Sequence, residues 1–390
     1  MEINNKTVWD LIELLSCALD GIDLPEEHIR DMDLSAVACL AEFHSVEAIC
    51  AFALEAYFWK HQEENSESAR YWKRIRERSI RKSMLLDAER EKILAYFEKE
   101  KIWFMPLKGC ILKDYYPAYG MRQMADNDIL YDASFQEQVR EFMISQGYRA
   151  ESVGKCHHDV YHKEPVYNFE LHTTLVTPGH GEKLWEYYKN IREKLLPGEH
   201  KKCALHFTDE DFYLFVVVHA YKHYQRSGTG FRTLTDLYVF LKEKRNVLDW
   251  GYICTEAEKL GVAKFEKDIR NLSDSIFGNK ACIPAELTKE QEIQLEEYVL
   301  SGTYGTMEQS VRKKLGTLQA EGKSAKMITK IKYLWRRLFP PVVLYGEESF
   351  YCRHKWASPI FWMKRIVWVL LTDRKRILQE VKYVKKTREI

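Results

Sequence analysis

The sequence is poor in the residues that mark loop-rich or disulfide-stapled proteins. Gly and Pro number only 18 and 10 in 390 residues, which favours a helix-rich fold because both residues weaken helices. The nine cysteines are an odd number and lie far apart. This usage is typical of reduced thiols and argues against a disulfide framework. We therefore expect a helix-rich cytoplasmic protein.

The sequence also lacks a segment that predicts export or membrane insertion. The stretch MEINNKTVWDLIELL has no basic region followed by an apolar one, so no signal peptide is expected. The most apolar segment, residues 359–371, contains Lys364 and Arg365 and is too short to span a bilayer. It is interpreted as a helix with contacts in a core.

Net charge is small, but it is unevenly distributed. The formal net charge is +1, so no overall field indicates a nucleic-acid partner. From residue 323 to residue 390, however, 17 Lys and Arg stand against 5 Asp and Glu. This basic tail predicts contact with a polyanion or a membrane surface, or packing on the acidic remainder of the chain.

Hydrophobic residues are abundant, at 46 %, and their spacing divides the chain into three regions. Residues 1–100 and 179–390 are mainly helical in pattern, whereas 101–178 alternate short apolar runs with helices. This pattern predicts an α+β fold, a small mixed-sheet core flanked by N-terminal and C-terminal helical regions. The expected core strands span 102–107, 127–132, 148–153, 159–164 and 167–176.

Helices within and around this core are predicted from their caps and stops. Thr7 is expected to cap the first helix, and Ser134 to cap a helix that ends at Gly147. Residues 110–120 predict a short helix ended by Pro117 and Gly120, and residues 181–196 predict one continuous helix.

Two aspartates, Asp126 and Asp128, bracket Asn127 at the start of the second expected strand. Alternate residues of a strand share a face, so the two carboxylates would lie side by side. Carboxylates this close repel unless a cation lies between them, and oxygen ligands favour Mg²⁺ or Mn²⁺. Alone, the pair also fits a polar turn or a solvated strand edge.

The surrounding sequence favours a phosphoryl-transfer site over a turn. Lys108 and Gly109 follow the first strand and lead into a helix, where a glycine lets backbone N–H groups approach phosphates. Glu170 lies on a later strand that can neighbour the strand with the aspartates. Three acids with Lys108 and Arg122 nearby suit metal-assisted transfer of a phosphoryl group.

The motifs LKG…Y…R…ADNDIL…GY…HHDVYHK…FELH resemble the uncharacterised bacterial nucleotidyltransferase family of the polymerase-beta-type superfamily. The resemblance extends over roughly residues 30–370, through the helical segment with His219, His223, Arg232 and Asp236, to LFPP at 338–341. It implies that the α/β core is a nucleotidyltransferase core. It also implies transfer of a nucleoside monophosphate from an NTP, such as ATP, to an unidentified small molecule, protein or RNA.

The resemblance also implies a role for individual residues. Asp126 and Asp128 would hold two Mg²⁺ or Mn²⁺ ions, and Glu170 would be the third acid and would help to deprotonate the acceptor. Gly109 would be the phosphate-turn glycine, with Lys108 before it, and Arg122 would approach the triphosphate.

Two residues depart from the superfamily pattern. Cys110 follows Gly109 where Ser or Gly is usual, and Asn127 lies between the acids where an apolar residue is usual. Asn127 indicates a strand that is less buried on its back face or that begins later. These departures keep open a second hypothesis, a nucleotide-binding regulatory protein of the same fold with weakened catalysis. A third hypothesis is an RNA-binding or RNA-modifying protein that uses the basic tail.

Several histidines have spacings that zinc sites also use. His219 and His223 are four residues apart on a helix, and Cys156, His157, His158 and His162 cluster near a strand. The first pair has no HExxH motif and no obvious third ligand, and the second set lacks the paired-ligand spacing of a structural zinc site, so structural hydrogen bonding or contact with substrate is the favoured interpretation. His172 shares a strand face with Glu170 and would orient that carboxylate or bind a phosphate. Arg232 and Asp236 fit an ion pair within one helix.

Overall fold

The computed structural model describes residues 5–61, 66–152, 158–278, 286–322, 326–340, 354–372 and 374–386. Contacts between residues divide the chain into two units. The first unit comprises residues 1–222 and 230–303, and the second comprises residues 223–229 and 304–390. This division does not test the three regions expected from the sequence, because one unit contains the N-terminal helices, the sheet and several later helices. The three regions remain a prediction from the order of the elements.

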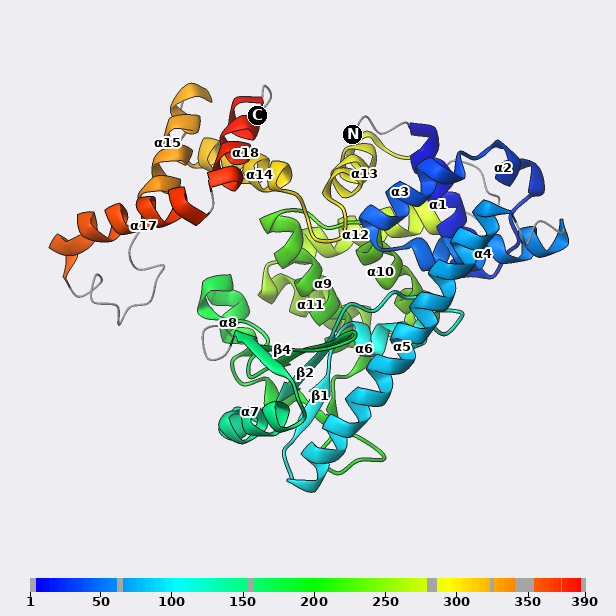
Figure 1. Cartoon of the computed structure of the whole chain (residues 1–390), viewed down its shortest axis with the longest axis horizontal. Helices are drawn as coiled ribbons and strands as arrows, with labels where there is room; N and C mark the ends of the chain where they lie inside the picture. The colour runs from blue at the N-terminus through cyan, green and yellow to red at the C-terminus, as the bar shows by residue number, and fades with distance from the viewer. Residues whose placement is uncertain are drawn as a thin grey trace. The chain divides into compact units, whose positions relative to one another are not determined.

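The first unit holds the sheet and most of the helices (Figure 1). Its elements are α1 (Asn5–Asp20), α2 (Glu26–Asp31), α3 (Leu34–His44), α4 (Glu47–Lys60), α5 (Glu67–Lys99), β1 (Phe104–Pro106), α6 (Gly109–Leu112), the 3-10 helix η1 (Lys113–Tyr115), β2 (Asn127–Tyr131), η2 (Ala133–Phe135), α7 (Gln136–Ser145), β3 (Arg149–Ser152), β4 (His158–Lys163), β5 (Tyr167–His172), η3 (Pro178–His180), α8 (Glu182–Tyr188), η4 (Ile191–Lys194), β6 (Leu196–Pro197), β7 (Leu205–His206), α9 (Asp209–Arg226, which enters the second unit after Lys222), α10 (Phe231–Lys244), α11 (Trp250–Leu260), α12 (Ala263–Phe277) and α13 (Lys289–Ser301).

The main sheet is mixed and has five strands in the order β1-β2-β5-β4-β3. β2 and β5 run parallel, and the other neighbouring pairs are antiparallel. The expected α+β fold, with a small mixed sheet between helical regions, is thus confirmed. The parallel pair is the one that matters for the site, since it brings residues 127–130 beside residues 169–172.

One face of this sheet forms the core of the α/β region. The alternating residues Ile129 and Tyr131 of β2 and Phe169 and Leu171 of β5 are buried against helices α5 and α7. Figure 1 shows α5 running along the sheet. Because strand side chains alternate between faces, the residues between them, Asp128 and Glu170 among others, point to the opposite face.

Two helix starts differ from the sequence expectations. The first helix already includes Asn5, so Thr7 is inside it and is not its cap. The turn before α7 is capped by Asp132, whose carboxylate accepts the N–H of Ser134, so the expected Ser134 cap is wrong. Gly147 does end that segment, with a φ of 83°, a conformation that glycine adopts readily.

The expected helix over 181–196 is interrupted. Helix α8 ends at Tyr188, and residues 191–194 form only a 3-10 turn. Leu196 and Pro197 are extended because they pair with residues 205–206 in a small two-stranded sheet. A tertiary pairing has thus overridden local helix propensity.

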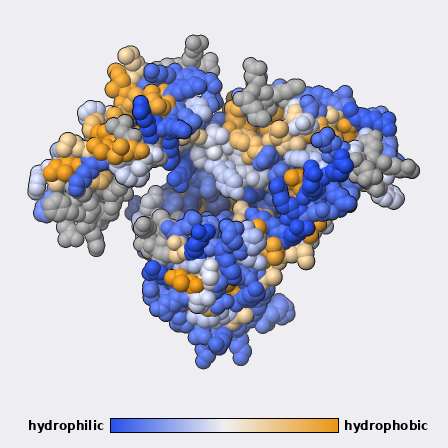
Figure 2. All heavy atoms as spheres, in the orientation of Figure 1, coloured by the Kyte–Doolittle hydropathy of each residue, from blue (hydrophilic) through white to orange (hydrophobic). Residues whose placement is uncertain are grey.

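The second unit contains the basic tail. Its elements are the end of α9 together with α14 (Met307–Gly322), α15 (Lys326–Leu338), η6 (Lys355–Ala357), α17 (Ser358–Thr372) and α18 (Arg374–Lys386). Figure 2 shows hydrophobic side chains gathered over α15 and α17. The exposed large side chains of these helices also include Trp335 and Trp368. Within the described ranges, no helix combines the length and the apolar character that crossing a membrane requires. Contact of this tail with a polyanion stays a prediction.

Candidate active site

The acidic face of the sheet brings together residues from two neighbouring strands. Asp128 on β2 and Glu170 on β5 are directly paired in the parallel register, which confirms that the two strands are neighbours. His172 follows on the same face of β5, and its Nε2 lies 2.9 Å from Oδ1 of Asp128. The same Nε2 lies 3.7 Å from Oε2 of Glu170. Two of the three predicted acids and one predicted histidine therefore meet at one place.

Asp126 lies immediately before the strand, because β2 begins at Asn127. Burial, and then the charge of Asp128, raise the pKa of Asp126. Burial and the charges of Asp128 and Asp126 likewise raise the pKa of Glu170, to about 7. The three carboxylates are thus close enough to repel one another, as the expected metal site requires.

Asp128 differs from its two acidic neighbours because it has cationic and hydrogen-bonding partners. Burial alone would raise its pKa, but Lys108 and His172 outweigh burial and hold the pKa well below its usual range. The Nζ atom of Lys108 donates to Oδ1 of Asp128 at 2.8 Å. Asp128 is therefore ionised, and its negative charge is balanced by Lys108 in the turn before α6.

The turn at Lys108 and Gly109 has its unusual backbone conformation at the lysine. Lys108 has φ 45° and ψ −115°, a region that non-glycine residues rarely adopt, whereas the φ of Gly109 is not positive. A backbone outlier of this kind is typical of functional sites. The strained residue is the one that holds Asp128, a point that the Lys-Gly motif alone did not reveal.

Gly109 is needed for packing against Arg122. A Cβ atom on residue 109 would lie 2.5 Å from Nη1 of Arg122. That guanidinium is buried and bound to both carboxylate oxygens of Asp236, by Nε at 2.7 Å and by Nη2 at 2.8 Å. Because Arg122 is held in place from α10, contact between Arg122 and a triphosphate stays a prediction.

We predict that Gly109→Ala destabilises the protein by about 1–3 kcal/mol, the usual range for overpacking a rigid site. Arg122 cannot move aside without lengthening its bonds to Asp236. Urea denaturation followed by tryptophan fluorescence measures the change. The matched control is Gly179→Ala, where an added Cβ meets only Thr177 Oγ1 at 3.6 Å. Equal stability of the two variants would show that Arg122 is free to move.

Asn127 is fully buried, so the expectation of a less buried back face is wrong. Its amide nitrogen donates to the carbonyl oxygen of Leu86 at 3.1 Å, and its Oδ1 accepts from Nη1 of Arg90 at 3.1 Å. The thiol of Cys110 also donates to Oδ1, at 3.3 Å. The two residues that depart from the superfamily pattern, Asn127 and Cys110, are therefore bonded to each other and to helix α5. Burial raises the pKa of the Cys110 thiol to about 11, which argues against a nucleophilic role.

We predict that Asn127→Leu, which restores the apolar residue, destabilises the protein by about 1–3 kcal/mol. Leucine would leave the Leu86 carbonyl and the buried side of Arg90 without their partner. Urea denaturation checks this, with the exposed Asn190→Leu as control, for which a change within about 0.5 kcal/mol is expected. A stability equal to the unmodified protein would mean that the hydrogen bonds of Asn127 contribute nothing.

Cations from three further helices surround the acids, and two of them were missed from the sequence. Burial lowers the pKa of Lys82 on α5, and the charge of Asp126 opposes this shift. Burial raises the pKa of Asp126, and the charge of Arg232 on α10 opposes that shift. Burial, and then the charge of Lys108, lower the pKa of Lys222 on α9 to about 8. In the part of the chain that the structure describes, neither Lys82 nor Lys222 forms an ion pair. Nothing in their local sequence distinguishes them from surface lysines.

The other candidate histidines lie in different surroundings. His158 lies beside His172 across the β4–β5 pair, with ring centroids 4.9 Å apart. Nε2 of His162 instead lies 3.1 Å from Oε2 of Glu151. Cys156 and His157 lie outside the described residues. Among the described residues, one set of three potential metal ligands is close together, and it consists of His158, Glu170 and His172, without His219 or His223.

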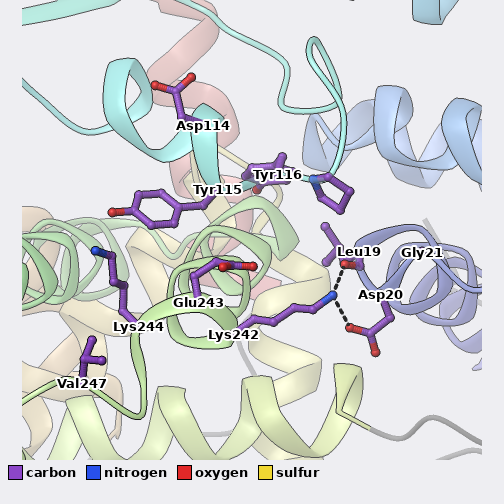
Figure 3. A pocket seen from close by; sticks show the side chains of 11 residues that line it. Leu19, Asp20, Gly21, Asp114, Tyr115, Tyr116, Lys242, Glu243, Lys244 and Val247 are labelled. Carbon is purple, nitrogen blue, oxygen red and sulfur yellow. Dashed lines mark hydrogen bonds and ion pairs between the residues drawn. The ribbon is translucent and has the colours of Figure 1, made fainter.

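A cavity of about 710 Å³ lies elsewhere in the first unit (Figure 3). Its wall includes Tyr116, whose hydroxyl donates to Oδ1 of Asp236 at 2.8 Å. On another side Lys242 donates to the carbonyl of Leu19 and pairs with Asp20. None of the three acids lines this cavity, so we do not assign the chemistry to it.

The acidic cluster fits the divalent cations that the family resemblance implies. Its donors are carboxylate oxygens, which Mg²⁺ and Mn²⁺ prefer. Burial, together with negative charge that Lys108 compensates only in part, raises the pKa values of Asp126 and Glu170. A bound cation would relieve this repulsion, so the residues and the group are compatible.

Comparison with known proteins identifies one family. The sequence model of a family described as "Uncharacterised nucleotidyltransferase" matches residues 30–278. The matched region contains the whole acidic site and ends before the segment at 338–341. No curated protein and no solved structure matches the chain.

Proposed function

The chain belongs to the uncharacterised nucleotidyltransferase family, and on this premise we propose that it transfers a nucleoside monophosphate from an NTP to a hydroxyl or phosphate acceptor. Pyrophosphate is the second product. The observation that carries the proposal is the sheet face on which Asp128 pairs with Glu170, with Asp126 beside them and cationic side chains around them. Acids that hold metal and cations that hold phosphate are the parts that phosphoryl transfer needs.

The three acids would divide the metal binding between them. Asp126 and Asp128 would hold two Mg²⁺ or Mn²⁺ ions, and Glu170 would hold one of them. Ions bound there would neutralise charge on the triphosphate and activate the acceptor oxygen. Glu170 would also assist in taking the proton of the acceptor hydroxyl.

The surrounding cations would bind and orient the triphosphate. Lys82 and Lys222 are partly buried and form no ion pair with a described residue, so their charges are available to phosphate oxygens. Even with its pKa lowered to about 8, Lys222 is mostly protonated at neutral pH. Lys108 would exchange its bond to Asp128 for one to a phosphate oxygen, which matches its position at the strained turn.

A second candidate, nucleotide binding without turnover, is favoured by one observation. Oδ1 of Asp128 already accepts from Lys108 and lies 2.9 Å from His172, so both would have to rearrange before this oxygen could bind an ion. A protein in which they stay in place would bind an NTP through its cations and release no pyrophosphate.

A pyrophosphate-release screen separates the two candidates. The full-length chain is incubated with each common NTP and with Mg²⁺ or Mn²⁺, in the presence of cell extract as a source of acceptors. Metal-dependent release, with a nucleotidylated product found by mass spectrometry, is the expected result. NTP binding by calorimetry without release supports the second candidate, and absence of both binding and release contradicts the proposal.

A further inference from the structure

The strand pair β4–β5 places two histidines and one acid on the same face of the sheet. His158 is directly opposite His172, and Glu170 is two residues before His172 on β5. The side chains of residues two apart in a strand point the same way, and so do those of directly paired residues. Two imidazoles therefore flank the third acid of the proposed metal site.

We propose that His158, Glu170 and His172 form a nitrogen-rich cation site, selective for a transition-metal dication such as Zn²⁺ or Co²⁺ over Mg²⁺. The inference rests on the proposed function, because Glu170 would contact both this ion and one of the proposed Mg²⁺ or Mn²⁺ ions. It adds two ligands that the acidic triad does not include.

The distances fit a bound ion closely. Nε2 of His172 lies 3.7 Å and Nε2 of His158 lies 3.9 Å from Oε2 of Glu170. One ligand atom from each of the three residues falls within 4.8 Å of the others. Two ligands of a tetrahedral Zn²⁺, at bonds of about 2.0–2.2 Å, are about 3.4 Å apart. Small side-chain rotations would therefore bring all three residues onto one ion.

The protonation state of the histidines suits metal binding. Burial, and then the charge of Lys108, lower the pKa of His158. Burial lowers the pKa of His172 to about 4, against the opposing effect of Asp128. Both shifts favour the neutral imidazole, which is the form that binds metals. A neutral His172 donates its Nε2 proton to Asp128, and metal binding at Nε2 would need the other tautomer, with the proton on Nδ1.

The choice of metal follows from the donor atoms. Imidazole nitrogen binds Zn²⁺ and Co²⁺ well, whereas Mg²⁺ prefers oxygen donors and octahedral geometry. Asp128 Oδ1, at 2.9 Å from His172 Nε2, would become a further oxygen ligand once Lys108 and His172 give up their hydrogen bonds to it. The site would then share Asp128 and Glu170 with the proposed Mg²⁺ positions, and its occupancy would set which metal supports nucleotide binding.

Cobalt absorption spectroscopy tests the proposal without measuring activity. Co²⁺ with nitrogen ligands in a four- or five-coordinate site absorbs visible light more strongly than octahedral Co²⁺ with oxygen ligands. We expect the full-length protein to show the stronger bands, excess Zn²⁺ to remove them, and excess Mg²⁺ to leave them in place. We expect His158→Gln to weaken Co²⁺ binding by at least about tenfold, since even outer partners of metal ligands contribute this much.

The matched control is His162→Gln, on the same strand and paired with Glu151 instead of the cluster; it should keep both the spectrum and the affinity. His172→Gln should behave as His158→Gln does, and the variant of the partly exposed His158 carries the test alone if the His172 variant does not fold. Weak octahedral bands in the unmodified protein, or an unchanged spectrum in His158→Gln, would overturn the proposal.

The two proposals fail in different ways. If the cobalt bands are absent while NTP binds with Mg²⁺ and pyrophosphate is released, only the nitrogen-rich site is wrong. If the bands are present and respond to His158→Gln while no NTP binds, the metal site stands and the nucleotidyl-transfer function is wrong.

Discussion

Replacing both aspartates, by Asp126→Asn with Asp128→Asn, should reduce pyrophosphate release by at least about 10³-fold. Each bound cation is expected to stabilise charge in the transition state by several kcal/mol, and about 1.4 kcal/mol corresponds to a factor of ten in rate. Asparagine keeps the size of the side chain but removes the negative charge that would attract the ions. Mg²⁺-dependent NTP binding, measured by calorimetry, should be lost as well.

The matched control for this variant is Asp132→Asn, which makes the same exchange at the other end of β2. Asp132 caps the following turn through Ser134, and asparagine can keep that hydrogen bond. Asp126 makes no hydrogen bond with a described residue, so Asp126→Asn alone tests the site if the double variant does not fold. Unchanged NTP and Mg²⁺ binding in folded variants would place the site elsewhere.

Breaking the buried ion pair by Asp236→Asn should destabilise the protein by about 3–5 kcal/mol, the usual effect of leaving one charge of a buried pair uncompensated. The side chains of Arg122 and Asp236 are only 9 % and 10 % exposed. Tyr116 also donates to Asp236, so the substitution disturbs three residues that connect the sheet region to α10. Urea denaturation should show the loss as a lower midpoint.

The control for this prediction is Asp274→Asn, which breaks the Arg245–Asp274 pair at 39 % and 34 % exposure. An ion pair this exposed contributes about 0–1 kcal/mol. Arg122→Met combined with Asp236→Leu should recover part of the stability, because it removes both buried charges. Equal effects of Asp236→Asn and Asp274→Asn would show that burial of the pair does not set its contribution.

The parts of the site that the sequence predicts are those set by local patterns. The strand that carries Asp128 and the strand that carries Glu170 follow from short apolar runs bounded by turns. Alternation along each strand then places both carboxylates on one face. The ending of the segment at Gly147 likewise follows from the conformational freedom of one residue.

The parts that the sequence did not predict depend on contacts between distant segments. Arg122 and Asp236 are 114 residues apart, and nothing in the sequence around Lys222 distinguishes it from a surface lysine. Asn127 looked like a sign of exposure, because a polar residue is rarely fully buried unless it is hydrogen-bonded. Its partners, Leu86 and Arg90 on α5, could be identified only from the fold.

Crystals grown with Mn²⁺ and a non-hydrolysable NTP analogue test the central claim most directly, through the anomalous scattering of manganese. We predict an anomalous peak within bonding distance of carboxylate oxygens of Asp126 and Asp128, with the triphosphate of the analogue beside it. A nucleotide bound elsewhere, or manganese bound without contact to either aspartate, would contradict the account.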